Sequence, residues 1–218
     1  MSDAELNPAT DATAEAAAPT RKRPKPGERR IQILQALASM LEQPGAERIT
    51  TAALAAKLEV SEAALYRHFA SKAQMFEGLI EFIEQAVFSL VNQIAERESG
   101  ATDPAAGARH AGKVVTMLLQ FAEKNPGMVR VMVGDALVFE NDRLQQRMNQ
   151  FFDKIESTLK QCLREGAPGG AATPTADAQV QASVLTAFVV GRMQRFARSG
   201  FRRLPTEHME ASLAQMLR

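Results

Sequence analysis

The chain of 218 residues has one cysteine, one tyrosine and no tryptophan. A single cysteine rules out an internal disulfide framework. Cys162 falls on the apolar face of a predicted helix, which favours a buried, inert thiol over a nucleophile. No run of about 18 apolar residues is present, so no transmembrane helix is predicted. The acidic, alanine-rich N-terminus does not resemble a signal peptide, and we expect a cytoplasmic protein.

Sequence motifs of enzymes and metalloproteins are also missing. The chain contains no Walker loop and no GxGxxG, HExxH or paired-cysteine motif. Its three histidines lie in separate segments without the spacing of metal ligands. The glycine-rich stretch 166–170 follows a predicted helix and lacks the Lys-Ser/Thr of a phosphate-binding loop. The sequence therefore predicts no enzymatic activity, no cofactor and no bound metal.

The N-terminal residues have little that could fold. The chain carries 26 basic and 25 acidic residues, so the distribution of charge, and not its sum, must indicate any nucleic-acid partner. Residues 1–18 have almost no large apolar side chains. The basic stretch 20–27 has two prolines that disfavour a helix. We predict a disordered arm over residues 1–28, basic at its end, which is either a contact to DNA or a solvated linker.

The stretch ITTAALAAKLEVSEAALYRHFASKAQM, residues 49–75, predicts two short helices and the start of a longer one. Thr50 and Ser61 are predicted N-caps, because each hydroxyl can accept from a free amide of the first helical turn. Ile49 and Leu54 have the spacing of a hydrophobic staple. Ser71 caps the long helix, and Gln74 three residues later completes a capping box.

The second short helix is the predicted recognition helix. Leu65 and Phe69 share its inward face, which leaves the small and polar side chains pointing outward. Such a helix pair with a tight turn suits the DNA major groove, although an ordinary helical hairpin in an all-helical core has the same spacing. The candidate DNA-binding residues are Thr50, Thr51, Ser61, Glu62, Ala63, Tyr66, Arg67, His68 and Lys72.

Helices are predicted for the rest of the chain. The first spans residues 29–42, and the helix that follows Ser71 carries an apolar stripe of Met75, Leu79, Ile83, Val87, Leu90 and Ile94. Phe82 and Phe88 fall off this stripe, so they either pack against other helices or belong to a partner surface. Later helices are predicted from Asp103-Pro104, from the cap Asn125, over residues 139–164 and 180–201, and from the cap Thr206-Glu207.

VSEAALYRHFASK resembles the recognition-helix signature of the TetR family of bacterial DNA-binding proteins. This resemblance implies an all-α fold, with a three-helix helix-turn-helix unit over residues 29–75 and a larger helical domain for dimerisation and partner binding over residues 76–218. It also implies a homodimer formed by the last long helices, bound to double-stranded DNA. Glu59 departs from the family, because such turns often carry glycine, and a positive φ there costs about 1 kcal/mol.

A second stretch, EKNPGMVRVMVGDALVFENDRLQQRMNQFFDKIE, is similar to family members that act in nucleoid occlusion, in a region where TetR relatives generally differ. This resemblance implies a nucleoid-associated protein that, on DNA, binds the cell-division protein FtsZ and blocks Z-ring assembly. The implied partner surface lies near Phe82, Lys124 and Asn125, although Asn125 has a competing role as a helix cap. One alternative is a repressor that releases DNA when a small molecule binds its C-terminal domain. Another is a helical interaction module without DNA.

Overall fold

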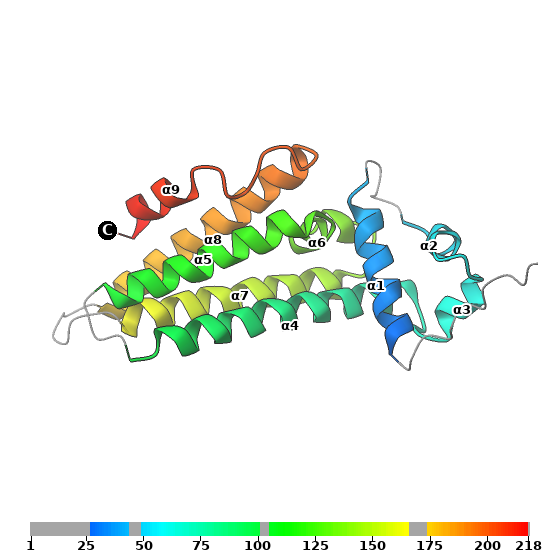
Figure 1. The fold of residues 1–218 in the computed structure, drawn as a ribbon, viewed down its shortest axis with the longest axis horizontal. Helices are drawn as coiled ribbons and strands as arrows, with labels where there is room; N and C mark the ends of the chain where they lie inside the picture. Colours follow the sequence, from blue (N-terminus) through cyan, green and yellow to red (C-terminus); the bar gives the residue numbers. More distant parts are fainter. Residues whose placement is uncertain (1–26, 44–48, 101–104, 166–173, 218) are drawn as a thin grey trace, which may run out of the picture.

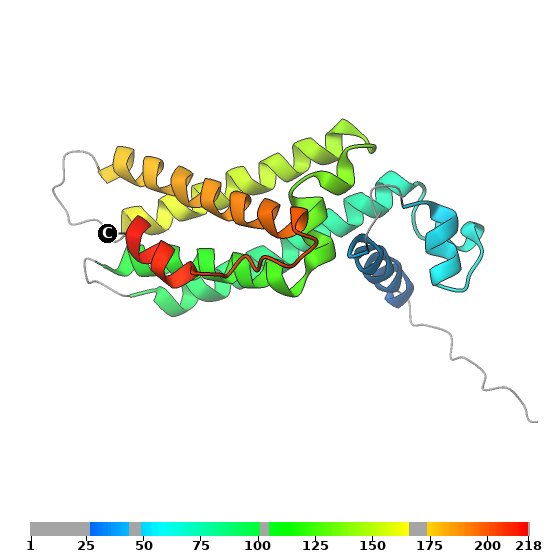
Figure 2. The same cartoon turned by 90° about the horizontal axis from the view of Figure 1, so that it is seen from above.

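The computed structural model describes residues 27–43, 49–100, 105–165 and 174–217. Within these ranges the chain forms helices and no strands, as the sequence predicts. A small N-terminal unit lies at one end of an elongated helical bundle (Figures 1 and 2). Residues 1–26 of the predicted arm, the glycine-rich stretch 166–170 and Asp103-Pro104 lie outside the described residues, while Glu28 at the end of the predicted arm already belongs to the first helix.

The N-terminal unit consists of α1 (Glu28–Leu41), α2 (Thr51–Lys57) and α3 (Glu62–Tyr66). Both predicted caps are confirmed, since the Thr50 hydroxyl accepts from the amide of Ala53 and the Ser61 hydroxyl from the amide of Ala64. The predicted staple residues Ile49 and Leu54 are both buried. Local capping chemistry and a few apolar side chains are therefore sufficient to define both short helices.

The long helix α4 (Lys72–Glu98) begins at the predicted cap, where the Ser71 hydroxyl accepts from the amide of Gln74. The Gln74 side chain accepts from the amide of Ala70, one residue before the predicted capping-box partner. The predicted apolar stripe is buried at Met75, Leu79, Ile83 and Val87.

Three apolar side chains of α4 bear on the sequence prediction, which Leu90 corrects and which Phe88 and Phe82 had left open. Leu90 was expected inside, but its side chain is exposed and Val91 is buried in its place, because the helix turns past the stripe by one residue. Phe88 packs edge-on against Phe151 at 5.7 Å between ring centroids. Phe82, in contrast, remains 41% exposed.

The bundle is formed by α4, α5 (Ala106–Lys124), α7 (Asp142–Glu165) and α8 (Pro174–Arg198), which lie side by side (Figure 1). Its core contains buried side chains from each helix, among them Val115, Leu118, Phe151, Ile155, Leu159, Leu185 and Val189. Cys162 is also buried, as predicted. On the α4–α7 contact, Arg147 Nη2 lies 2.7 Å from Glu84 Oε2. This hydrogen bond raises the pKa of the Arg147 guanidinium.

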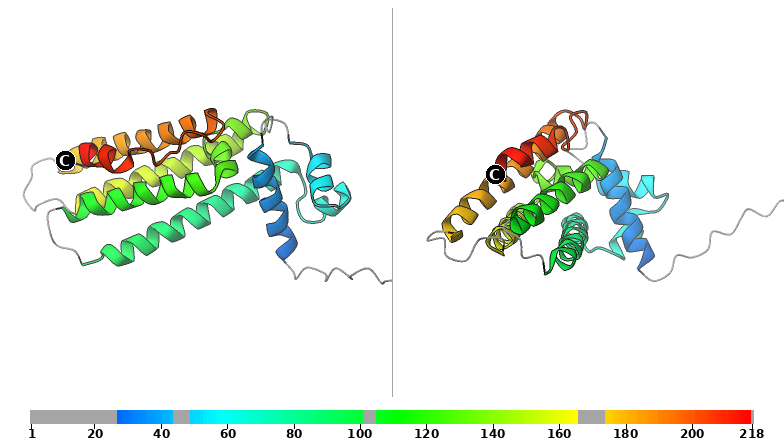
Figure 3. Two further views of the ribbon diagram at one scale, coloured as in Figure 1. Left: turned by 45° about the horizontal axis from the view of Figure 1, so that its top comes forward. Right: turned by 60° about the vertical axis from the view of Figure 1, so that its left-hand side comes forward.

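Several predicted element bounds are wrong. The helix expected from residue 139 is α7, which begins at Asp142 after the short 3-10 helix η2 (Asp135–Leu137), and Phe139 is exposed before it. The helix expected over residues 180–201 is α8, which begins earlier and ends earlier. The final helix is α9 (Met209–Met216), which lies beside α8 (Figure 3). Thr206 does not cap α9, because its hydroxyl instead bonds the Glu123 carboxylate.

Short α6 (Pro126–Met132) joins the bundle to the N-terminal unit by packing against α1. A Cβ on Gly127 would lie 1.9 Å from the carbonyl oxygen of Ala38, so only glycine permits this approach. The predicted boundary between residues 75 and 76 falls within α4, which runs unbroken from one unit to the other. Among the described residues, no helix is long and apolar enough to cross a membrane, and no cluster of metal-binding side chains occurs.

Candidate nucleic-acid interface

The outer face of α3 is polar and accessible. Leu65 and Phe69 are each 1% exposed, so they anchor the helix end as the sequence predicts. The predicted DNA-binding residues of this stretch all lie on the exposed side: Ser61, Glu62, Ala63, Tyr66, Arg67 and His68. A short helix with its apolar side held inside and its outer side exposed can enter a DNA groove, with its first residues nearest the bases.

The first turn of α2 lies against the first turn of α3. The Thr51 hydroxyl donates to Glu62 Oε2 at 2.6 Å. Thr50 precedes it and is exposed, with its hydroxyl oxygen in the cap. Four predicted DNA-binding residues, Thr50, Thr51, Ser61 and Glu62, therefore occupy two neighbouring helix starts.

Lys72 differs from the other predicted DNA-binding residues because it already has an anionic partner. Its Nζ lies 2.5 Å from Glu140 Oε1 and 5.7 Å from the centre of the Phe76 ring. A DNA phosphate that binds the Lys72 ammonium group must compete with the Glu140 carboxylate. Sequence reasoning missed Glu140, since nothing local in the sequence links the turn before α7 to the start of α4.

Arg30 is a second residue that sequence reasoning missed. Its Nη1 donates to the backbone carbonyl of His68 at 2.9 Å, and its guanidinium lies 4.1 Å from the centre of the Phe69 ring. These contacts fix the end of α3 on α1. Because a charged residue in the first turn of any helix usually faces solvent, the sequence offers no signal for this role.

The predicted partner residues come from two places, with Phe82 on α4 and Lys124 and Asn125 at the corner between α5 and α6. The two long helices run antiparallel, and an ion pair between Lys113 and Glu98 fixes their register. With equal rise along both helices, Leu90 lies level with Phe121. Lys124 is exposed at this corner.

Asn125 does not cap α6 with its side chain, which corrects the prediction. Its Nδ2 instead donates to the carbonyl of Phe121 at 2.7 Å and so satisfies the end of α5. A side-chain amide can serve either neighbouring helix, and the sequence alone does not distinguish the two.

A shallow groove of about 360 Å³ lies between α4 and α5. Its lining combines apolar, basic, acidic and neutral polar side chains: Ile94, Arg97, Glu98, Lys113, Thr116, Met117 and Gln120. The hydrogen bond from Lys113 lowers the pKa of Glu98 below its usual value, so this carboxylate is charged at neutral pH. Because Glu98 pairs with Lys113, Arg97 leaves the groove with a net positive charge.

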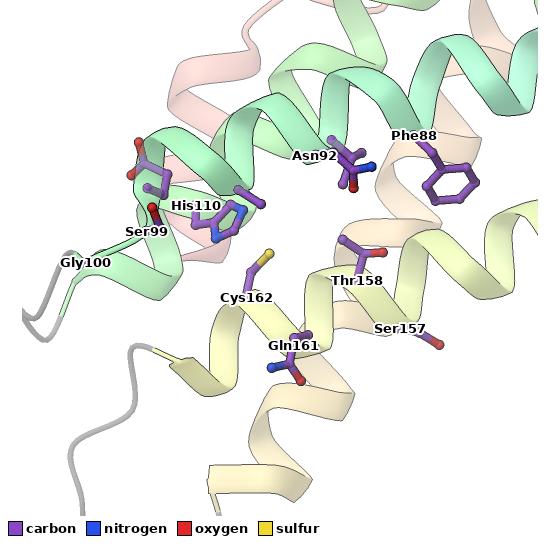
Figure 4. A pocket seen from close by; sticks show the side chains of 12 residues that line it. Phe88, Asn92, Ser99, Gly100, His110, Ser157, Thr158, Gln161 and Cys162 are labelled. Atoms are coloured by element: carbon purple, nitrogen blue, oxygen red, sulfur yellow. The ribbon is translucent and has the colours of Figure 1, made fainter.

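A larger hollow of about 750 Å³ lies between α4 and α7. His110 and Cys162 point into it from its inner side, and Phe88 lies toward one end (Figure 4). Asn92, Ser157 and Gln161 are exposed, so most of the polar groups are at the rim of the hollow. A ligand there would be oriented by few buried polar groups.

Two family models match the chain. Residues 33–79 match the bacterial regulatory proteins of the tetR family. Residues 109–218 match a tetracyclin repressor-like C-terminal domain of the SlmA-like type. The two matches cover the helix-turn-helix and most of the bundle.

Curated relatives match over nearly their full length. The nucleoid occlusion factor SlmA of Idiomarina loihiensis is 51% identical over 183 residues, which is 84% of this chain and 90% of the relative. The SlmA of Alteromonas mediterranea is 48% identical over 186 residues, 85% of this chain and 92% of the relative.

Solved structures share the fold at low identity. The transcriptional regulator FadR from Bacillus subtilis, in complex with stearoyl-CoA, aligns with a TM-score of 0.66 and 13% identity. The alignment covers 86% of this chain and 97% of that one. This likeness concerns the arrangement of helices alone.

Proposed function

We propose a function for this chain, which belongs to the TetR family of bacterial regulatory proteins and, within it, to the nucleoid occlusion factors SlmA. The protein is a nucleoid occlusion factor. Members of this family are DNA-binding regulators and not enzymes. The observation that carries the proposal is the identity of about half of the aligned residues, in alignments that cover 84% and 85% of this chain. The protein then acts in the cytoplasm, on the nucleoid.

DNA is bound by the N-terminal unit, residues 29–75. The exposed starts of α2 and α3 enter the major groove through Thr50, Thr51, Ser61, Glu62 and Ala63. Around them, Tyr66, Arg67, His68 and Lys72 hold phosphates, which position the protein without reading sequence. The exposure of this helix face and the anchoring of Leu65 and Phe69 support this assignment.

The protein acts as a homodimer through the domain of residues 76–218. Val180 and Val184 on α8 are 66% and 50% exposed, and they lie one turn apart with half-buried Phe188 one turn further. An apolar row of this kind on a long helix is typical of a subunit interface. Two-fold symmetry would then place two recognition helices on two half-sites.

The partner of the DNA-bound dimer is FtsZ, held through its acidic and hydrophobic C-terminal tail. Exposed Phe82 and Leu90 offer apolar contacts on α4, while exposed Arg97 near the end of α4 and exposed Lys124 at the end of α5 supply positive charge. Asn125 directly follows Lys124 in the chain. A basic rim around apolar side chains complements an acidic peptide that carries apolar residues.

The hollow between α4 and α7 favours one competing function. A cavity of about 750 Å³ is large enough for a small molecule, which would make the protein a ligand-responsive repressor. In that case the α4–α5 face would have no peptide to bind. The same experiment separates the two functions.

The test is the fluorescence anisotropy of a labelled FtsZ tail peptide titrated with the protein, with and without duplex DNA carrying its site. We expect saturable binding that persists on DNA. Lys124→Glu should weaken peptide binding at least tenfold and leave DNA affinity unchanged, because it reverses a charge on the rim of the α4–α5 face. Lys154→Glu reverses the charge of an exposed lysine on α7 and should change neither.

Two results would contradict the proposal. Equal peptide affinity for Lys124→Glu and the wild-type protein would move the site off this face. No peptide binding at tens of micromolar, together with tight and specific DNA binding, would favour the ligand-responsive repressor. Asn125→Ala is a second variant, whose thermal unfolding must be followed because its amide also stabilises the end of α5.

A further inference from the structure

The hydrogen bond between Thr51 and Glu62 is unusual for a surface that must approach DNA. It joins the first residue of α2 to the first residue of α3, and its 2.6 Å length indicates a strong bond to a charged acceptor. Glu62 is exposed, so its carboxylate lies at the rim of the predicted DNA-contacting face. A negative charge at this position is repelled by every phosphate of the duplex.

A carboxylate can offset that repulsion only where the duplex presents a hydrogen-bond donor. In the major groove guanine presents the acceptors N7 and O6, and thymine presents the acceptor O4. Cytosine presents the N4 amino group, whereas adenine combines its N6 amino group with the acceptor N7. An ionised carboxylate is acceptor-only, and cytosine is the base whose own major-groove edge presents a donor and no acceptor.

Thr51 removes the main obstacle to such a contact. An exposed glutamate loses rotamer freedom when it binds, and this loss weakens the contact. The Thr51 hydroxyl already holds Oε2, which leaves Oε1 of the same carboxylate to accept from a base. Preorganisation of this kind strengthens a contact without adding an atom to it.

We propose that Glu62 is the specificity-determining residue that reads one cytosine in each half-site, and that Thr51 is its positioning residue. The inference rests on the proposed DNA-binding function. Leu54 on α2 and Leu65 on α3 are each 1% exposed, so both helices have buried apolar anchors besides this hydrogen bond.

The experiment measures affinity for each single-base-pair change in the preferred DNA site, which is first selected from a random duplex pool with the wild-type protein. For the wild-type protein, replacing the cytosine read by Glu62 should weaken binding by roughly 5- to 150-fold, the range expected for one specific base contact. Glu62→Gln should shift the preference at that position from cytosine to adenine, because glutamine pairs with adenine N6 and N7. Glu62→Ala should accept all four bases there alike.

The positioning role has its own pair of variants. Thr51→Val, which lacks the hydroxyl, should reduce the cytosine preference at that one position and leave the other positions unchanged. Thr51→Ser keeps the hydroxyl and should retain the preference. Glu96→Gln, at an exposed site near the far end of α4, removes the same charge and should leave every base preference as it is.

Each alternative predicts a different result. A purely structural bond predicts that Thr51→Val weakens binding to all sequences equally, with a lower thermal unfolding midpoint, and this would overturn the positioning role. Unchanged base preferences in both Glu62 variants would overturn the reading role, while the wild-type preference would still support the proposed function. A wild-type protein that binds all duplexes alike would overturn both.

Discussion

Glu59 fixes the angle between the two helices of the DNA-binding motif through its backbone. Its φ is +53°, in the left-handed region that side chains disfavour. The amide of the next residue, Val60, bonds back to the carbonyl of Ala55, and this closes the end of α2. The tight turn therefore requires a conformation that glycine would adopt without strain.

This strain gives a prediction at the scale of one residue. Glu59→Gly should unfold with a free energy about 1 kcal/mol higher than that of Glu59→Ala. Both variants lose the glutamate side chain, and only alanine keeps the Cβ that disfavours positive φ. Denaturant unfolding at one protein concentration measures the difference. Equal stability of the two variants would mean that the turn relaxes to another conformation.

At the scale of elements, the contact between α1 and α6 determines how the DNA-binding unit sits on the bundle. Gly127 in the first turn of α6 lies against the backbone carbonyl of Ala38 in α1. Asn125, one of the proposed partner residues, is the N-cap position of the same short helix. The DNA-binding unit and the bundle are therefore linked by the α1–α6 contact as well as by α4, which runs from one into the other.

Gly127→Ala should destabilise the protein by about 1–3 kcal/mol, because the added methyl group must displace backbone. Gly112→Ala on α5 is the matched control, since its Cβ would meet only a methyl group of Leu217 at 3.2 Å. Alanine is also the better helix former, so the control should be neutral or slightly stabilising. Chemical denaturation of both variants tests this. A loss in the control as large as that in Gly127→Ala would contradict the close approach.

The elements that sequence predicted best are those with local signals. Thr50, Ser61 and Ser71 cap helices through amides only three residues away, so short-range chemistry determines their positions. The errors concern which apolar side chains are buried in the core. Leu90 and Phe139 are apolar yet exposed, and composition cannot state which way an apolar side chain points.

In the candidate sites, too, local features were predicted and contacts between distant residues were not. The outward face of α3 follows from helical periodicity and was predicted correctly. The ion pair of Lys72 with Glu140 and the hydrogen bond from Arg30 to the carbonyl of His68 join residues that are distant in the chain, and no local pattern encodes them. Which of these side chains contact DNA stays a prediction.

At the scale of the whole molecule, the proposed contacts to DNA and to a protein partner occupy different regions. The short helices α2 and α3 lie at one end, while the long face of α4 and α5 extends away from them (Figures 1 and 2). A duplex against α3 therefore leaves most of the α4–α5 face uncovered. This arrangement is what an adaptor between chromosome and division machinery requires.

The dimer provides the prediction that involves the whole molecule. Val184→Glu would place a carboxylate in the apolar row of α8, and two-fold symmetry would place two in one interface. Burying charges without partners costs several kcal/mol, so we expect the dimer to weaken on the order of a thousandfold. Sedimentation equilibrium should show the mass falling to that of one chain. Affinity for a DNA site with two half-sites should fall as well, because each monomer then binds alone.

Val138→Glu is the control for this variant. Val138 is 70% exposed in the turn before α7 and lies outside the α8 row, so the same substitution should leave the mass unchanged. If Val184→Glu remained dimeric and bound two half-sites normally, α8 would not form the interface, and its exposed valines would need another partner. If both variants became monomeric, the interface would extend to the α7 end of the bundle, close to the DNA-binding unit. In that case dimerisation and the Lys72–Glu140 contact would share the same turn, and DNA binding would be coupled directly to assembly.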